Sequence, residues 1–289
     1  MDDCVVAPVS VVIPCFRCAT SIRRAVASVE QQTLKPAEVV LIDDASGDDT
    51  LSVLHELARS YPAWIRVIAL EKNQGPASAR NVGWEAATQP YLAFLDADDS
   101  WHPGKVRIQY GFMRKTPDVD ISGHQCIFRR EGEAAPEIFE PLTITRISAI
   151  SLIFRNSFST PTVMLKRHIP FRFEENKRYA EDLYLWQRVA FGGGMVMRME
   201  CPLAYMFKAP YGVAGLSAEM WAMEKGQLSN FIALYKARHI SWVLLVLASV
   251  FSIAKYFKRL VHVEVMHEEG VSPNLGQSGR RTYWHDGSP

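Results

Sequence analysis

The sequence predicts an α/β protein with a mostly parallel central sheet, helices on both faces and a C-terminal helical extension. In the N-terminal part, short apolar runs alternate with stretches whose apolar residues recur at helical spacing. Acidic pairs directly follow two of these runs, and a long apolar stretch lies near the other end of the chain. An alternation of strands and helices of this kind forms parallel strands covered by helices.

Four strands and three helices are expected before residue 96. Pro14 is expected to end the first strand, because proline cannot donate to a sheet ladder. Thr20 or Ser21 is a candidate cap for the first helix. The expected strands cover 9–13, 39–42, 65–70 and 91–95, and the expected helices cover 20–32, 48–60 and 77–87.

The second half is less regular. Its expected strands cover 119–128, 159–165 and 195–207, with a loop at 129–141. Its expected helices cover 179–191 and 220–236. Three glycines, at 192–194, are expected to end the first of these helices. The tail at 268–289 is rich in Gly, Ser and Pro and is expected to be disordered.

Composition excludes some classes of protein. A formal net charge of +1 gives no bulk electrostatic argument for nucleic-acid binding. Five widely spaced cysteines do not resemble a disulfide framework, and Cys15 and Cys18 are interpreted as small residues in a turn. No leader pattern follows Met1, so we expect the chain to stay in the cytoplasm.

Residues 240–254 are uncharged and apolar, but the segment is shorter than the roughly 20 residues that a membrane span needs. Lys255, Lys258 and Arg259 follow at once. Such a helix can lie in a membrane interface, so we expect peripheral membrane contact through 240–259. A core helix packed on the domain is the alternative.

Acidic residues follow two of the predicted parallel strands, at 43–44 and 96–99, as Pro14 follows the first. The carboxyl ends of such strands border one crevice, where ligands bind. Asp96 and Asp98 are hard oxygen ligands suited to Mg²⁺ or Mn²⁺, and phosphate oxygens can complete the metal's coordination shell. The pair therefore predicts a site for a metal-bound diphosphate.

Three further features have two interpretations each. Asp43 and Asp44 could accept hydrogen bonds from a base or ribose, or could form an Asx turn. The Glu181–Asp182 pair could supply a general base, or could only interact with the dipole of its helix. Arg80 could meet a phosphate, or could lie on a solvated helix face.

Five ordered segments together resemble the inverting family 2 glycosyltransferases of the GT-A fold. They are 9–16 (VSVVIPCF), 40–46 (VLIDDAS), 73–83 (NQGPASARNVG), 94–103 (FLDADDSWHP) and 181–186 (EDLYLW). The resemblance is strongest before residue 110, extends to about 190 with the last segment, and is loose beyond it.

The resemblance implies a role for each site residue. Asp182 looks like the general base, and Asp98, together with Asp96, like the ligands of Mg²⁺ or Mn²⁺. Asp43 looks like the residue that recognises the nucleotide base. The remaining nucleotide-binding candidates are Pro14, Asp44, Arg80 and Asp96, and the supporting residues are Asp99, Glu181 and Trp186.

The resemblance also implies a reaction. The chain lacks the Q-x-x-R-W motif of processive synthases, since Gln187 and Arg188 are adjacent, so a single addition is expected. The donor would be a nucleotide-diphosphate sugar, with UDP favoured. The acceptor would be a glycan, in particular a lipid-linked glycan of bacterial surface polysaccharide, at the inner face of the membrane. A non-catalytic nucleotide-sugar-binding or membrane scaffold protein is the alternative.

The resemblance also implies how the chain is divided into regions. A GT-A domain is expected over 1–215, with a nucleotide-binding half at 1–115 and an acceptor half at 116–215. The C-terminal helices would occupy 216–267.

Overall fold

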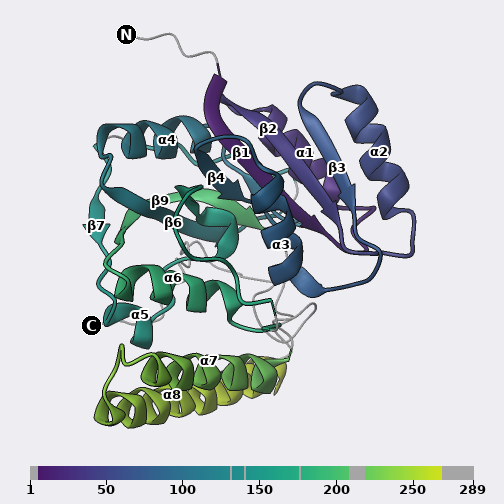
Figure 1. Cartoon of the computed structure of the whole chain (residues 1–289). Helices are drawn as coiled ribbons and strands as arrows, with labels where there is room; N and C mark the ends of the chain where they lie inside the picture. Colours follow the sequence, from purple (N-terminus) through teal and green to yellow (C-terminus); the bar gives the residue numbers. More distant parts are fainter. Residues whose placement is uncertain (1–5, 131, 140, 176, 208–218, 269–289) are drawn as a thin grey trace.

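The computed structural model describes residues 6–130, 132–139, 141–175, 177–207 and 219–268 (Figure 1). The tail predicted to be disordered, apart from Glu268, and the domain boundary expected at 215 lie outside these residues. The predicted α/β class is confirmed. The chain alternates through β1 (Val6–Cys15), α1 (Ile22–Glu30), β2 (Lys35–Asp43), α2 (Thr50–Ser60), β3 (Ile65–Ala69), α3 (Gly75–Ala86) and β4 (Tyr91–Phe94).

The described strands form one sheet in the order β3-β2-β1-β4-β8-β6-β9-β5, and β7 pairs with β9. The first four strands are parallel, as are β6 and β9, whereas β8 runs antiparallel to β4 and β6. The later strands are β5 (Ser100–Trp101), β6 (Val119–Phe128), β7 (Ile144–Arg146), β8 (Met164–Lys166) and β9 (Met195–Met206).

The alternation of side chains along β1 explains how both faces of the sheet are covered. Val9, Val11 and Ile13 belong to a core with apolar residues of α1, α2 and α4 (Lys105–Lys115). Val12 points to the other face and joins a core with residues of α3 and α6 (Glu181–Phe191). Gly83 allows α3 to lie close to β1, because a β-carbon there would collide with Val12.

The strand order places the carboxyl ends of β1, β2 and β4 at the same edge of the sheet. β1 leads through α1 to β2 on one side and has β4 on its other side, so the direction of winding reverses beside β1. Ligands bind at such a switch point, outside the carboxyl ends of the strands. Cys15 at the end of β1 pairs in register with Asp43 at the end of β2, and Asp96 follows β4 by two residues.

Several predicted boundaries were wrong. β1 continues through Pro14 to Cys15 and pairs there with β2. The strand predicted at 159–165 begins instead as a 3-10 turn, η1 (Thr160–Thr162), and only then enters β8. Ser21 occupies the N-cap position of α1, but its side chain makes no capping hydrogen bond. Four elements had no predicted counterpart: β5, α4, β7 and α5 (Ser151–Phe154).

Two long helices, α7 (Met220–Lys236) and α8 (Trp242–Glu268), lie together below α5 and α6 (Figure 1). One side of α8 packs inward, where Ala248 joins Phe231 and Leu234 of α7 in a small core. The other side exposes large apolar residues. None of the helices in the described part of the chain has the length and apolar character that a membrane crossing requires.

Candidate active site

Arg80 of α3 joins two acidic segments that are distant in the sequence. Its Nη1 donates to Glu181 Oε1 at 2.8 Å, and its Nη2 donates to Asp96 Oδ1 at 2.9 Å. The Arg80 side chain is only 6% exposed, so the interpretation as a solvated helix face was wrong. Burial alone would lower the pKa of Arg80, but Asp96, Glu181 and Asp182 together raise it.

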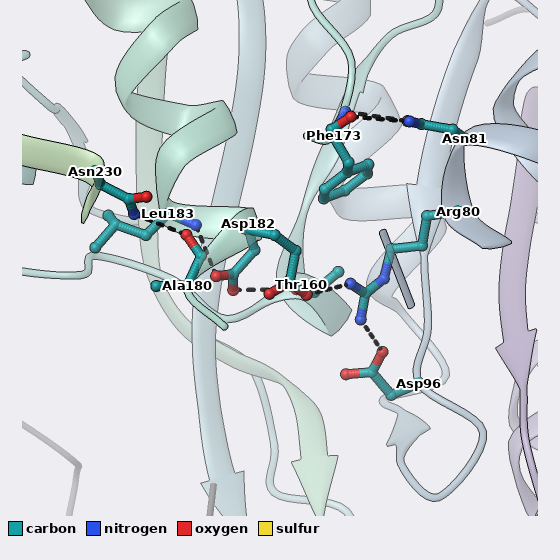
Figure 2. Close-up of polar contacts among 10 residues, drawn as sticks. Arg80, Asn81, Asp96, Thr160, Phe173, Ala180, Asp182, Leu183 and Asn230 are labelled. Atoms are coloured by element: carbon teal, nitrogen blue, oxygen red, sulfur yellow. Dashed lines mark hydrogen bonds and ion pairs between the residues drawn. The ribbon is translucent and has the colours of Figure 1, made fainter. Parts of the chain in front are cut away.

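Asp182 lies beside this arginine at the start of α6 (Figure 2). Its Oδ2 accepts a hydrogen bond from the Thr160 hydroxyl at 3.1 Å, and its Oδ1 accepts one from the Leu183 N–H at 2.6 Å. Burial raises the pKa of Asp182, and the nearby Asp96 also raises it, while Leu183, Arg80 and Thr160 lower it. Asp182 is therefore oriented on two sides and is a stronger base than a solvated aspartate.

Glu181 is the more deeply buried member of the acidic pair, at 7% exposure. Burial and the neighbouring Asp182 charge together raise its pKa to about 7, against the opposing effect of the Arg80 charge. Three carboxyl groups, those of Asp96, Glu181 and Asp182, thus share one guanidinium. If all three ionise, the cluster has an excess of negative charge.

The D-x-D segment follows β4 in a turn in which the Asp99 N–H donates to the Asp96 carbonyl at 3.1 Å. Asp98 is partly exposed, and its carbonyl accepts a hydrogen bond from Arg24 at 2.7 Å. Asp99 is buried at 8% exposure. Asp96 faces the α6 acidic pair through Arg80, so the structure brings the two predicted catalytic segments together.

The two aspartates after β2 differ in their contacts. Asp43 accepts hydrogen bonds from the Ser46 hydroxyl and, at 3.4 Å, from the Ser46 N–H three residues on, so its carboxylate closes a local turn. Asp44 accepts the N–H groups of Gln74 at 2.7 Å and Gly75 at 2.8 Å. Burial raises the pKa of Asp44, and these two bonds oppose that rise. Both carboxylate oxygens of Asp44 therefore hold the loop before α3.

Pro14 lies at the same strand end, paired in register with Ile42. Trp186 lies elsewhere: its side chain is fully buried and its ring packs against Phe158 and Phe173. Trp186 is therefore a core residue beneath α6, and its supporting role stays a prediction. Phe173 also lies under the Arg80 guanidinium, at 5.5 Å from ring centroid to Cζ.

Sequence reasoning missed two residues that hold the α6 segment. Thr160 contacts Asp182 from η1, a turn that was predicted to be strand. Asn230 of α7 donates its side-chain amide to the Ala180 carbonyl at 2.8 Å (Figure 2). Ala180 has a φ of 55°, an uncommon value for a residue with a β-carbon, and it immediately precedes the acidic pair. Neither Thr160 nor Asn230 belongs to a recognisable sequence motif, so their contacts with the α6 segment can be identified only from the structure.

A divalent cation fits this donor chemistry. Among the described residues, no group of three or more His, Cys, Asp or Glu side chains could hold a metal alone. Mg²⁺ commonly takes only one or two carboxylates and completes its shell with substrate phosphates. The partly exposed Asp98 and Asp96 match that pattern, and the excess negative charge of the cluster would be offset by the ion.

Comparisons with known proteins identify the family and the fold. The family described as Glycosyl transferase family 2 matches residues 10–180, more than half of the chain. The Escherichia coli UDP-Glc:alpha-D-GlcNAc-diphosphoundecaprenol beta-1,3-glucosyltransferase WfaP is 36% identical over 107 residues, covering 36% of this chain and 41% of its own. The chain spans only 30–62% of the length of the first curated relatives that it matches.

Solved structures with the same fold include two sugar-nucleotide complexes. Staphylococcus aureus TarS 1-349 with UDP-GlcNAc has a TM-score of 0.64 at 19% identity, covering 86% of this chain and 72% of that one. The mannosyltransferase PcManGT from Pyrobaculum calidifontis, with GDP-Man and Mn²⁺, has a TM-score of 0.61 at 17% identity, covering 93% and 77%. At these identities the likeness establishes the fold.

Proposed function

Because the chain belongs to glycosyl transferase family 2, we propose that it is an inverting glycosyltransferase that adds a single sugar from a nucleotide-diphosphate donor to an acceptor hydroxyl. One observation supports this most: Arg80 bridges the D-x-D segment and the α6 acidic pair. The leaving diphosphate and the attacking hydroxyl must meet at one anomeric carbon. The groups that serve them must therefore lie close together, on opposite sides of that carbon.

Asp182 is the proposed general base. It accepts the proton of the acceptor hydroxyl as that oxygen attacks, and the nucleoside diphosphate leaves from the opposite face, so the anomeric configuration inverts. The raised pKa of Asp182 brings its basicity nearer to neutral pH, where general-base catalysis is most effective. Thr160 and the Leu183 N–H fix the direction of its carboxylate.

Asp98, together with Asp96, is proposed to hold Mg²⁺ or Mn²⁺. When bound, the ion acts as a Lewis acid for the charge that develops on the departing diphosphate. Both guanidinium contacts of Arg80 are to carboxylates, so we propose that Arg80 orients Asp96 and acts on the nucleotide through it.

For the donor we propose a UDP-sugar, with Asp43 and Pro14 next to the base and ribose. TarS has been solved with UDP-GlcNAc, and the name of WfaP states UDP-Glc as its donor. Asp43 is buried in its turn with Ser46, so a nucleotide would need either to displace that hydroxyl or to use the remaining lone pairs of the carboxylate.

For the acceptor we propose a lipid-linked glycan of bacterial surface polysaccharide. The name of WfaP gives a diphosphoundecaprenol-linked sugar as its acceptor. The outer face of α8 suits such a substrate, because a set of large apolar side chains is 45–66% exposed: Trp242, Val243, Val246, Leu247, Val250, Phe251, Phe257 and Val261. Residues 225–263 contain no Asp or Glu and six Lys or Arg. Apolar and cationic surface together favour the anionic inner leaflet of the cell membrane.

The test of activity uses the full chain and a panel of nucleotide sugars with Mn²⁺ or Mg²⁺. A donor should raise the melting temperature only when metal is present, and should then be hydrolysed slowly to the nucleoside diphosphate. Stabilisation without hydrolysis or transfer to any acceptor would support the alternative, a binding protein. Stabilisation by no nucleotide sugar would contradict the proposal.

The membrane contact is tested with vesicles of phosphatidylethanolamine and phosphatidylglycerol. Val250→Glu should abolish sedimentation with the vesicles, because it places a charge in the middle of the apolar face. Phe139→Glu is the control, since Phe139 is 76% exposed and lies in the segment between β6 and β7, outside α8. Equal sedimentation of both variants would refute the contact, and dissociation of a dimer by Val250→Glu would assign the face to a second copy of the chain.

A further inference from the structure

A cationic groove of about 340 Å³ lies between the strap, residues 177–180, and helix α7. Lys177 and Arg178 line it from the strap, and Lys225 lines it from α7, together with the hydroxyl-bearing Ser229. The residues that line the groove include no Asp or Glu. Three glutamates are near it. Glu219 accepts a hydrogen bond from the Tyr179 hydroxyl at 2.8 Å. Burial lowers the pKa of Lys177, and the charges of Glu174 and Glu181 oppose that effect.

The groove is a built feature of the fold. A β-carbon on Gly226 would lie 2.6 Å from the Tyr179 carbonyl oxygen, so the close approach of α7 to the strap requires glycine at this position. Lys177 Nζ donates to Ser229 Oγ at 2.5 Å, and Asn230 holds the Ala180 carbonyl. These contacts fix Lys177 and the backbone of the strap relative to α7.

We propose that this groove binds the diphosphate of a lipid-linked acceptor, an inference that rests on the function proposed above. Lys and Arg are the side chains that neutralise phosphate oxygens. Tyr179 precedes Asp182 by three residues, so the α-carbons of these two residues lie within about 11 Å of each other. A sugar attached to a diphosphate in the groove would have to span a distance of this order to reach the proposed base.

The position of the groove also suits the lipid. Lys225 lies 5.9 Å from the ring centroid of Trp221, and the Trp221 ring lies 5.4 Å from that of Tyr256 on α8. Trp221 is 51% exposed, and tryptophan and tyrosine favour the headgroup level of membranes. A lipid that leaves the groove past these rings would reach the apolar face of α8.

The experiment measures binding of farnesyl diphosphate, a short lipid diphosphate without sugar, to the full chain by calorimetry. We expect the double variant Arg178→Gln/Lys225→Gln to bind at least about tenfold more weakly, because two exposed charge contacts are lost. Both residues are exposed and are expected to be dispensable for folding. Lys236→Gln, an exposed cation of α7 outside the groove, is the control and should bind as the wild type does.

Two arms distinguish the sources of a diphosphate. Added UDP should not displace farnesyl diphosphate; displacement would assign the binding to the donor site and overturn the inference. Unchanged affinity in the double variant would also overturn it. Hydrolysis of UDP-sugars is measured in parallel. If the double variant hydrolyses UDP-sugars normally and binds farnesyl diphosphate as tightly as the wild type does, only the role of the groove is refuted. If the wild-type chain binds no nucleotide sugar, the proposed function itself is refuted.

Discussion

Arg80→Met should destabilise the protein strongly, because it leaves two carboxyl groups without their partner. The side chains of Arg80 and Glu181 are 6% and 9% exposed, so solvent screens their interaction little. Removing one member of a buried ion pair typically costs about 3–5 kcal/mol. We expect a loss of this size in the free energy of unfolding at pH 8, measured by urea denaturation.

The loss should depend on pH, and its sign follows from Glu181. Burial raises the folded-state pKa of Glu181 from 4.5 to about 7, although Arg80 lowers it. The stability that this raised pKa contributes is fully present below pH 4.5 and disappears as the pH rises through about 7. Without Arg80 the pKa rises further, so the variant continues to lose stability above that pH. The deficit relative to wild type should therefore be larger at pH 8 than at pH 5.5.

A matched control separates this effect from the loss of any arginine. Arg23 pairs with Glu56 on the surface, where the two side chains are 54% and 47% exposed. Arg23→Met should cost less than about 1 kcal/mol. If Arg80→Met costs no more than this control, or if its cost is the same at both pH values, the assignment of Arg80 as the buried link between the acidic segments is wrong.

Three further predictions concern the site and its support. Asp182→Asn should leave donor affinity unchanged and lower turnover by about 10²–10⁴-fold; a wild-type rate of sugar transfer would exclude Asp182 as the base. Asp98→Ala should weaken donor binding in the presence of Mn²⁺ but not in its absence, and calorimetry that shows equal affinities with metal would exclude Asp98 as a ligand. Gly83→Ala should lower the free energy of unfolding by about 1–3 kcal/mol because its methyl group overlaps Val12, whereas Gly111→Ala, where no atom lies within 4 Å, should not; equal thermal stability of the two variants would contradict the packing of α3 on β1.

The first half of the fold could be predicted because each element has a strong local signal. The buried strands are β-branched runs, and the helices between them have apolar residues at helical spacing. The second half depends on long-range pairing. β5 and β7 are two and three residues long and exist only because β9 lies next to them, so no local pattern could reveal them.

The site was predictable in part for a similar reason. Asp43, Asp96 and Asp182 could be identified because they belong to ordered segments that resemble a family. Arg80 was a candidate, but its role as the link to Glu181 depends on a contact between residues 101 positions apart. Thr160 and Asn230 have no local signal, since any threonine after a loop or asparagine on a helix looks the same in sequence.

The hydrogen bond from Asn230 to the Ala180 carbonyl ties α7 to the backbone immediately before Glu181 and Asp182. Because Ala248 of α8 packs with Phe231 and Leu234 of α7, the helix pair supports this segment on one side while α8 exposes an apolar face on the other. The two long helices are therefore part of the architecture that orients the acidic pair, and a substitution that loosens them is expected to disturb that orientation as well.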